Sequence, residues 1–261
     1  MRITTNGLVV REQKVNDCDR LITVLTADRG LVTAFADGAL RIKSKTVAAT
    51  GLLCFSTFTF YKGRDTYKVN EATVGEVFFR LRESIQKLTL AQYFCELALK
   101  LTPEEEPAGD ILRLLLNGLY LLAGELRPPL LIKSAIELRM LVLAGYMPDL
   151  SGCYSCESGG DGPFAFNVAE GGLLCESCVV SGGRGFDTSA GVSNPRPPDT
   201  TPLPPGVLAA MRHITGAEDS KVFSFTLPEN NMKALSDLSE KFLLAQTETV
   251  FKTLQFFHSV L

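Results

Sequence analysis

Two pairs of cysteines constrain this chain more than any other sequence feature. The pairs are Cys153-Tyr-Ser-Cys156 and Cys175-Glu-Ser-Cys178, with eighteen residues between them. In each pair two thiolates can converge on one cation from a tight turn, and two such turns complete a tetrahedron of sulfur ligands. The alternative is four ordinary buried cysteines. The spacing favours one structural Zn²⁺ per chain held by Cys153, Cys156, Cys175 and Cys178, because four thiolates leave no open position for a reacting water.

The number of cysteines also indicates the cellular compartment in which the protein works. The chain has seven cysteines, an odd number that argues against a pure disulfide framework. In a reducing compartment, closely spaced cysteines bind metal more often than they pair. We therefore expect Cys18, Cys54 and Cys95 to be free and mostly buried thiols. The first residues lack the apolar core of a signal peptide, and no uncharged apolar stretch reaches the ~18 residues of a membrane span. These features predict a cytoplasmic protein.

Residues 1–80 have the pattern of a β domain. Short apolar or aromatic runs alternate with turn residues, and a glycine that can adopt positive φ ends the loop 27–30. The predicted strands are Leu8–Val10, Leu21–Thr26, Leu31–Phe35, Leu53–Tyr61 and Thr66–Ala72. Five short strands with hairpin turns predict a small barrel or sandwich. We expect Phe55, Phe58 and Phe60 to lie in its core.

The remainder of the chain is mainly helical. Leu112, Leu115, Leu119 and Leu122 recur on one helix face, and a comparable pattern returns from Leu235 onward. The predicted organisation is α+β and multidomain. It comprises a β domain over 1–80, a helical domain over 81–150 that closes over 206–261, a zinc-binding lobe over 151–183 and a proline-rich connector over 184–205.

Net charge is divided unevenly along the chain. The total is −3, but residues 1–80 hold 12 basic and 8 acidic side chains, whereas residues 81–261 hold 14 and 21. Basic residues gather at two predicted turns of the β domain. They are Arg41, Lys43 and Lys45 in one and Lys62, Arg64 and Lys68 in the other. If the first stretch is extended, its three charges point to one side. Basic loops on a small barrel predict binding to nucleic-acid phosphates; the alternative is that they only keep the domain soluble.

Nothing in the sequence indicates an enzyme. No Gly-x-x-x-x-Gly-Lys-Ser/Thr loop occurs, so a P-loop ATPase is unsupported. The only histidines, His213 and His258, lie in or near predicted helices without a recognisable catalytic partner. We predict no catalytic residues and no enzymatic activity.

Several stretches, taken in order, resemble the bacterial recombination mediator family RecO. Asp28–Val32 followed by Asp37–Lys45 resembles the second hairpin and basic loop of that family. The segment from Ile136 to Leu150, leading into Cys153, is similar to its junction between helix and zinc lobe, and Lys252–Phe257 resembles its C-terminal signature. The order and spacing of these stretches cover nearly the whole chain.

The resemblance implies an OB-fold for the β domain and a protein that acts without hydrolysing nucleotides. Members of the family bind single- and double-stranded DNA, anneal complementary strands, engage the acidic C-terminal tail of single-strand-binding protein and help RecR to load RecA. Arg41, Lys43 and Lys45 match the family's DNA-contacting loop, and a location at the nucleoid follows.

Two features favour a larger role for partners. Asp37 stands where a basic residue commonly precedes the loop glycine of the family, and the chain as a whole is acidic. A protein-interaction adaptor with little direct DNA binding is therefore the alternative function. On the predicted helix Leu130–Gly145, Lys133 and Arg139 are the candidate contacts for an acidic tail; the alternative is that they lie on a solvated helix flank.

Overall fold

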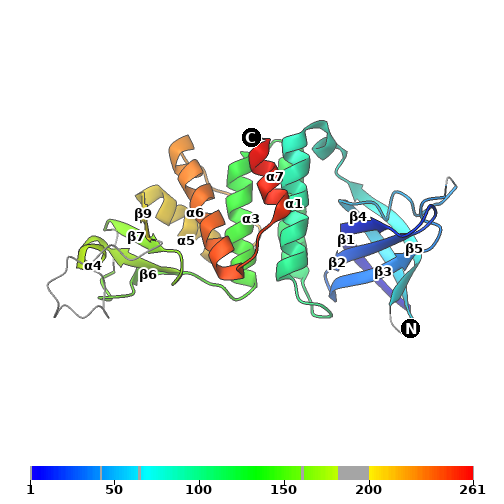
Figure 1. Ribbon diagram of the computed structural model, residues 1–261, viewed down its shortest axis with the longest axis horizontal. Helices are drawn as coiled ribbons and strands as arrows, with labels where there is room; N and C mark the ends of the chain where they lie inside the picture. The colour runs from blue at the N-terminus through cyan, green and yellow to red at the C-terminus, as the bar shows by residue number, and fades with distance from the viewer. Residues whose placement is uncertain (1, 42, 64–65, 160–161, 182–199, 261) are drawn as a thin grey trace. The chain divides into compact units, whose positions relative to one another are not determined.

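The computed structural model describes residues 2–41, 43–63, 66–159, 162–181 and 200–260 (Figure 1). It contains two compact units. Unit 1 consists of Met1–Pro129 together with Phe251–Leu261, and unit 2 consists of Leu130–Val250. Among the described residues, no helix combines the length and apolar character that a bilayer crossing requires.

Unit 1 begins with a closed five-stranded barrel. Its strands are β1 (Arg2–Lys14), β2 (Arg20–Thr26), β3 (Gly30–Ala36), β4 (Cys54–Lys62) and β5 (Tyr67–Val77). They are hydrogen-bonded in the order β1-β2-β3-β5-β4, and β4 pairs back with β1. All pairs are antiparallel except β3 with β5. This is the topology of an OB-type barrel, so the predicted fold class is confirmed and the sandwich alternative is excluded.

Alternation along the strands fills the barrel with apolar side chains. In β4, Phe58 and Phe60 are buried and their rings stack with centroids 5.3 Å apart. Phe55 is only partly buried, which corrects the prediction that it is a core residue. Its position, an odd number of residues from Phe58, places it on the opposite face of the strand. The core cluster comprises Val9, Ile22, Val24, Val32, Ala34, Phe58, Phe60 and Tyr67.

The turn between β2 and β3 depends on Gly30. This residue has φ +56°, in the left-handed region that favours glycine, as the sequence predicted. A Cβ atom here would also lie 2.3 Å from the carbonyl oxygen of Pro103. The glycine therefore both turns the hairpin and lets the segment after α1 pass close to it.

Helices complete unit 1. They are the 3₁₀ helix η1 (Phe79–Glu83), α1 (Ile85–Leu101), α2 (Gly109–Ala123) and α7 (Lys252–Ser259). Figure 1 shows α7 beside α1, although the two are far apart in sequence. The carboxylate of Glu96 in α1 accepts hydrogen bonds from the amides of Lys252 (3.3 Å) and Thr253 (3.0 Å). These amides are among those that a helix N-terminus leaves unpaired, so Glu96 fixes the start of α7.

Unit 2 combines helices with a small sheet. Its elements are α3 (Pro129–Leu143), β6 (Asp149–Cys153), β7 (Phe164–Asn167), β8 (Gly172–Cys175), α4 (Glu176–Ser181), β9 (Thr200–Leu203), α5 (Pro205–Gly216) and α6 (Glu229–Thr247). The sheet order is β6-β8-β7-β9. Phe166 of β7 packs edge-on against Phe242 of α6, with ring centroids 5.2 Å apart. Most of the predicted proline-rich connector lies outside the described residues, and its last part forms β9.

Candidate metal centre and nucleic-acid interface

The four cysteines of the two CxxC pairs come together in unit 2. Cys153 ends β6, Cys175 ends β8 and Cys178 lies in α4. Because β6 and β8 are parallel neighbours, their carboxyl ends meet at one edge of the sheet. All four sulfur atoms lie within 4.8 Å of one another, and the Sγ atoms of Cys156 and Cys175 are 3.6 Å apart.

This geometry fits a metal ion. A tetrahedral site with metal–sulfur distances of about 2.3 Å has sulfur–sulfur edges of about 3.8 Å, close to the distances found here. The cluster could therefore hold a metal ion with little movement of the chain. Its donor set is entirely sulfur, which suits a soft or borderline cation rather than Mg²⁺ or Ca²⁺.

Local hydrogen bonds favour the thiolate form at two of the ligands. The hydroxyl of Ser177, 3.1 Å from the sulfur of Cys175, and the amide of Cys178 lower the pKa of Cys175 to about 6. The hydroxyl of Ser158, 3.0 Å from the sulfur, and the amide of the same residue lower the pKa of Cys156. Because the thiolate is the form that binds metal, these contacts favour metal binding at Cys156 and Cys175, whereas burial raises the pKa of Cys178 to about 12.

The first group of predicted DNA contacts lies in loop 37–53, which joins β3 to β4. Arg41, Lys43 and Lys45 are all exposed there. The loop is built from turns rather than from a strand: the amide of Arg41 donates to Gly38 (3.1 Å), and that of Ser44 to Arg41 (2.8 Å). The extended conformation considered for this stretch is therefore wrong. The three exposed cations lie in turns, where strand alternation does not set their directions.

The second group of predicted contacts is partly neutralised by neighbouring acids. Lys62 lies 3.5 Å from Glu105, and Lys68 lies 3.4 Å from Asp37. All four side chains are exposed, so these ion pairs are weak and a phosphate could compete for either lysine. Arg64 lies outside the described residues. Asp37, the acidic residue singled out in the sequence, thus pairs with Lys68.

Lys133 and Arg139, the candidate partner contacts on α3, are both engaged inside unit 2. The Lys133 side chain has no exposed surface and lies 2.9 Å from Glu137 and 2.8 Å from Glu240. The prediction that Lys133 meets a partner is corrected accordingly, because an interior ammonium cannot reach one. Arg139 donates to the Thr215 carbonyl (2.9 Å) and pairs with Asp219 (3.0 Å), and its side chain is 14% exposed.

A sequence signal for this burial was present. The segment 129–143 is apolar around nearly its whole circumference, which is typical of a helix enclosed on all sides. The spacing of Lys133 and Glu137, by contrast, is equally common on solvated helix flanks.

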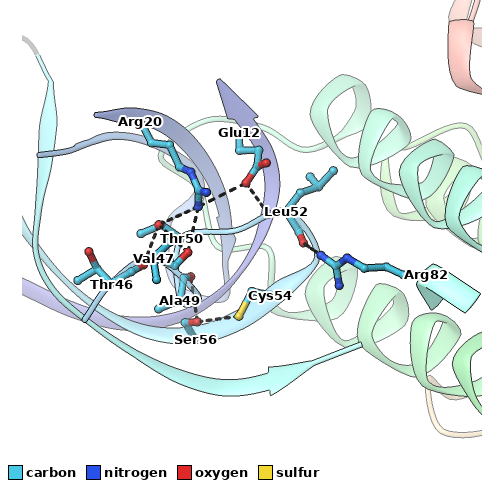
Figure 2. A network of polar contacts seen from close by, with 10 residues as sticks. All are labelled: Glu12, Arg20, Thr46, Val47, Ala49, Thr50, Leu52, Cys54, Ser56 and Arg82. Carbon is cyan, nitrogen blue, oxygen red and sulfur yellow. Dashed lines mark hydrogen bonds and ion pairs between the residues drawn. The ribbon is translucent and has the colours of Figure 1, made fainter. Parts of the chain in front are cut away.

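Sequence reasoning missed the residues that hold loop 37–53 on the barrel. Figure 2 shows Arg20 and Glu12, from β2 and β1, directed toward the end of the loop. The Arg20 guanidinium donates to the carbonyl of Val47 (3.0 Å) and to the hydroxyl of Thr50 (3.1 Å). These partners lie about 30 positions apart in sequence, and no local pattern marks such contacts.

The fold and the cysteine cluster define a class of protein: an OB-type barrel continued by helices and by a lobe with a metal-binding set of four cysteines. The chain belongs to the RecO family of DNA repair proteins. The family model described as Recombination protein O N terminal matches residues 1–78, and the one described as Recombination protein O C terminal matches residues 82–255.

Individual relatives agree with this assignment. The chain is 32% identical over 254 residues to the DNA repair protein RecO of Acetivibrio thermocellus, covering 97% of this chain and 95% of the relative. It is 27% identical over 254 residues to the protein of the same name from Symbiobacterium thermophilum, covering 96% and 94%. It is 34% identical over 178 residues to the DNA repair protein RecO of Alkaliphilus metalliredigens, covering 68% of this chain and 72% of the relative.

Proposed function

We propose that this protein is a non-enzymatic, DNA-binding mediator of recombinational repair. It binds single- and double-stranded DNA through the barrel and anneals complementary strands. The observation that carries the proposal is the exposed group of Arg41, Lys43 and Lys45 on a loop of an OB-type barrel, in a chain of the RecO family. Cations gathered on such a loop attract the phosphate backbone, and this attraction needs no base-specific contact.

The proposed partners follow from the family. The protein helps RecR to load RecA onto DNA coated with single-strand-binding protein, and it engages the acidic tail of that protein. Because Lys133 is buried, Arg139 is the remaining candidate on α3 for contact with the tail. Its guanidinium already forms an ion pair with Asp219. Acting on DNA in this way places the protein in the cytoplasm, at the nucleoid.

For the cysteine cluster we propose one Zn²⁺ per chain. Cys153, Cys156, Cys175 and Cys178 would hold it, and the all-thiolate set would leave no position for a reacting water. The ion would join the ends of β6 and β8 to α4 and so stabilise the lobe. Elemental analysis of the purified protein should find about one zinc per chain.

The DNA proposal is tested by oligonucleotide binding across a range of salt concentrations. Fluorescence anisotropy should give a log K that falls linearly with log[salt], with a slope of about −0.7 for each phosphate contact to a single strand. Replacing Arg41, Lys43 and Lys45 together by Ala should make the slope shallower by about 2 units, because three contacts are lost. A matched control replaces three exposed lysines of unit 2, Lys221, Lys233 and Lys241, by Ala.

The alternative function is a protein-interaction adaptor with little direct DNA binding. The excess of acidic residues after position 80 and the Asp37–Lys68 ion pair favour it. An adaptor would bind a peptide of the single-strand-binding-protein tail but would show no salt-dependent affinity for bare DNA. Unchanged binding in the triple loop variant would likewise contradict the DNA proposal, and DNA-dependent ATP hydrolysis would contradict a non-enzymatic role.

A further inference from the structure

We propose that Glu12, Asp19 and Arg20 are positioning residues that hold loop 37–53 in its bound shape before DNA arrives. The inference rests on the proposed function, because it assigns a role to residues that support Arg41, Lys43 and Lys45. The contacts that carry it lie within unit 1, between the loop and β1, β2, the turn that joins those two strands, and η1.

Arg20 holds the last part of the loop. It is nearly enclosed, with its side chain 12% exposed, so it is poorly placed to contact a phosphate itself. Its Nη1 atom reaches the Val47 carbonyl at 3.0 Å and the Thr50 hydroxyl at 3.1 Å (Figure 2). Thr50 is fully buried, and its hydroxyl donates in turn to the carbonyl of Thr46 at 2.8 Å. One guanidinium thus fixes the turn that follows the three cations.

Glu12 holds the same end of the loop from the neighbouring strand. Its Oε2 atom accepts the amide hydrogen of Leu52 at 2.9 Å and lies 3.5 Å from Nη1 of Arg20. Arg82 donates to the carbonyl of Leu52 at 3.3 Å, so the backbone amide and the backbone carbonyl of Leu52 are both hydrogen-bonded. Figure 2 shows Glu12 and Arg20 side by side over this end of the loop.

Asp19 holds the beginning of the loop. Its Oδ1 atom accepts the amide hydrogen of Gly38 at 2.7 Å, and its other oxygen accepts from the side chain of Asn16 at 2.8 Å. The neighbouring Cys18 carbonyl accepts the amide of Leu40 at 2.8 Å. The Gly38 amide, followed by the Asn16 side chain, lowers the pKa of Asp19, which keeps this carboxylate charged as an acceptor.

Holding both ends of the loop has a consequence for binding. A loop whose two ends are already held loses less conformational freedom when it meets DNA, so its contacts contribute more fully to affinity. The arrangement also explains why two carboxylates stand beside a basic loop. As bare charges they would repel phosphate, but as acceptors of loop amides they would strengthen binding. Removing a carboxylate should tighten DNA binding in the first role and weaken it in the second, so the two roles can be told apart by experiment.

Glu12 provides the sharpest test. Glu12→Gln removes the charge but keeps an acceptor oxygen, whereas Glu12→Met removes both. We expect the Gln variant to bind single-stranded DNA at least as tightly as the wild type and the Met variant to bind about 5-fold more weakly. Glu71→Met, at an exposed glutamate of β5, is the matched control and should leave binding unchanged or tighter. Glu12 is 38% exposed, so these variants should fold.

Arg20 provides a test with a different readout. Arg20→Met should weaken binding about 10-fold while leaving the slope of log K against log[salt] unchanged, because no phosphate contact is lost. Lys43→Ala, by contrast, should make that slope shallower by about 0.7. Hydrogen exchange measured by mass spectrometry should become faster over residues 37–53 in Arg20→Met and remain unchanged over β1 and β2.

Two results would overturn the positioning role. One is a Glu12→Met variant that binds DNA as tightly as the wild type or more tightly, which is the behaviour expected of the Glu71→Met control. The other is an Arg20→Met variant that changes the salt slope as much as Lys43→Ala, since Arg20 would then be a phosphate contact. Failure of the proposed function would give a different result. In that case the triple replacement of Arg41, Lys43 and Lys45 would leave DNA binding intact, and the positioning role would be ruled out as well.

Discussion

Lysines meet carboxylates in both units, but in opposite surroundings. On the barrel, Lys62 and Lys68 face Glu105 and Asp37 across exposed pairs at 3.5 and 3.4 Å. In unit 2, Lys133 faces two carboxylates with its own side chain fully buried. Water screens the first kind of pair and leaves its lysine able to exchange partners, whereas breaking the second kind would leave a charge buried without a partner, which is strongly unfavourable.

The buried group of unit 2 is a connected network. Glu137 on α3 accepts from Lys133 and, at 2.6 Å, from the hydroxyl of Ser239 on α6, while Glu240 of α6 contacts Lys133 directly. Burial disfavours the charge on Lys133, but the carboxylates of Glu137 and Glu240 outweigh it and raise the pKa of the ammonium. The network therefore joins α6 to α3 through Lys133 and Glu137, whose side chains are fully buried, and through Glu240, whose side chain is 19% exposed.

The largest expected effect is the loss of the metal, which should unfold part of unit 2 but leave the barrel of unit 1 folded. Replacing Cys153 and Cys156 by Ser should abolish zinc binding and unfold the lobe over β6–α4, because the metal supplies folding free energy that four thiols lack. The barrel, with its apolar core, should stay folded. Zinc content and hydrogen exchange resolved by segment would check this. A variant without metal whose lobe exchanges as slowly as the wild type would contradict the structural role of the ion.

The next effect concerns the buried lysine. Lys133→Met should destabilise unit 2 by about 3–5 kcal/mol, because it leaves Glu137 buried without its cation. Urea denaturation followed by circular dichroism measures the loss. As a control, combining Lys133→Met with Glu137→Leu should recover much of it, since an apolar pair replaces the stranded charge. If the single variant is as stable as the wild type, the buried pair does not hold α3 and α6 together.

The smallest effect is expected at the exposed pair on the barrel. Lys68→Met should leave the denaturation midpoint of the protein unchanged. Asp37→Asn should tighten binding to single-stranded DNA by about 2-fold at low salt, because it releases Lys68 for a phosphate and removes a repulsive charge. Anisotropy titrations at two salt concentrations would detect the change. Weaker binding in Asp37→Asn would show that this carboxylate supports the site instead of competing with it.

The parts of the molecule that the sequence predicted are those governed by local rules. The CxxC spacing predicted that four cysteines would meet, and the alternation around Phe58 and Phe60 together with the glycine at position 30 predicted strands and a turn. The OB topology itself came from the resemblance to a family, since strand patterns alone left a sandwich open.

The parts that the sequence did not predict depend on contacts between distant segments. Lys133 looks like an ordinary surface residue until α6, about a hundred positions later, covers it with Glu240. The turns of loop 37–53 depend on Arg20 and Glu12, whose side chains act through a shared network rather than a sequence motif. Burial and pairing of this kind are properties of the assembled fold.

The docking of α7 on α1 has a consequence for how the chain is made. Phe251 packs edge-on against Tyr93, with ring centroids 5.8 Å apart, and Glu96 caps the helix that follows. Unit 1 thus contains segments from both sides of unit 2 in the sequence. During translation, the ribosome releases everything needed for unit 2 before it delivers α7. Until α7 emerges, the contact of Tyr93 with Phe251 and the hydrogen bonds of Glu96 with the start of α7 cannot form, so the packing of α1 is completed only after unit 2 has been synthesised.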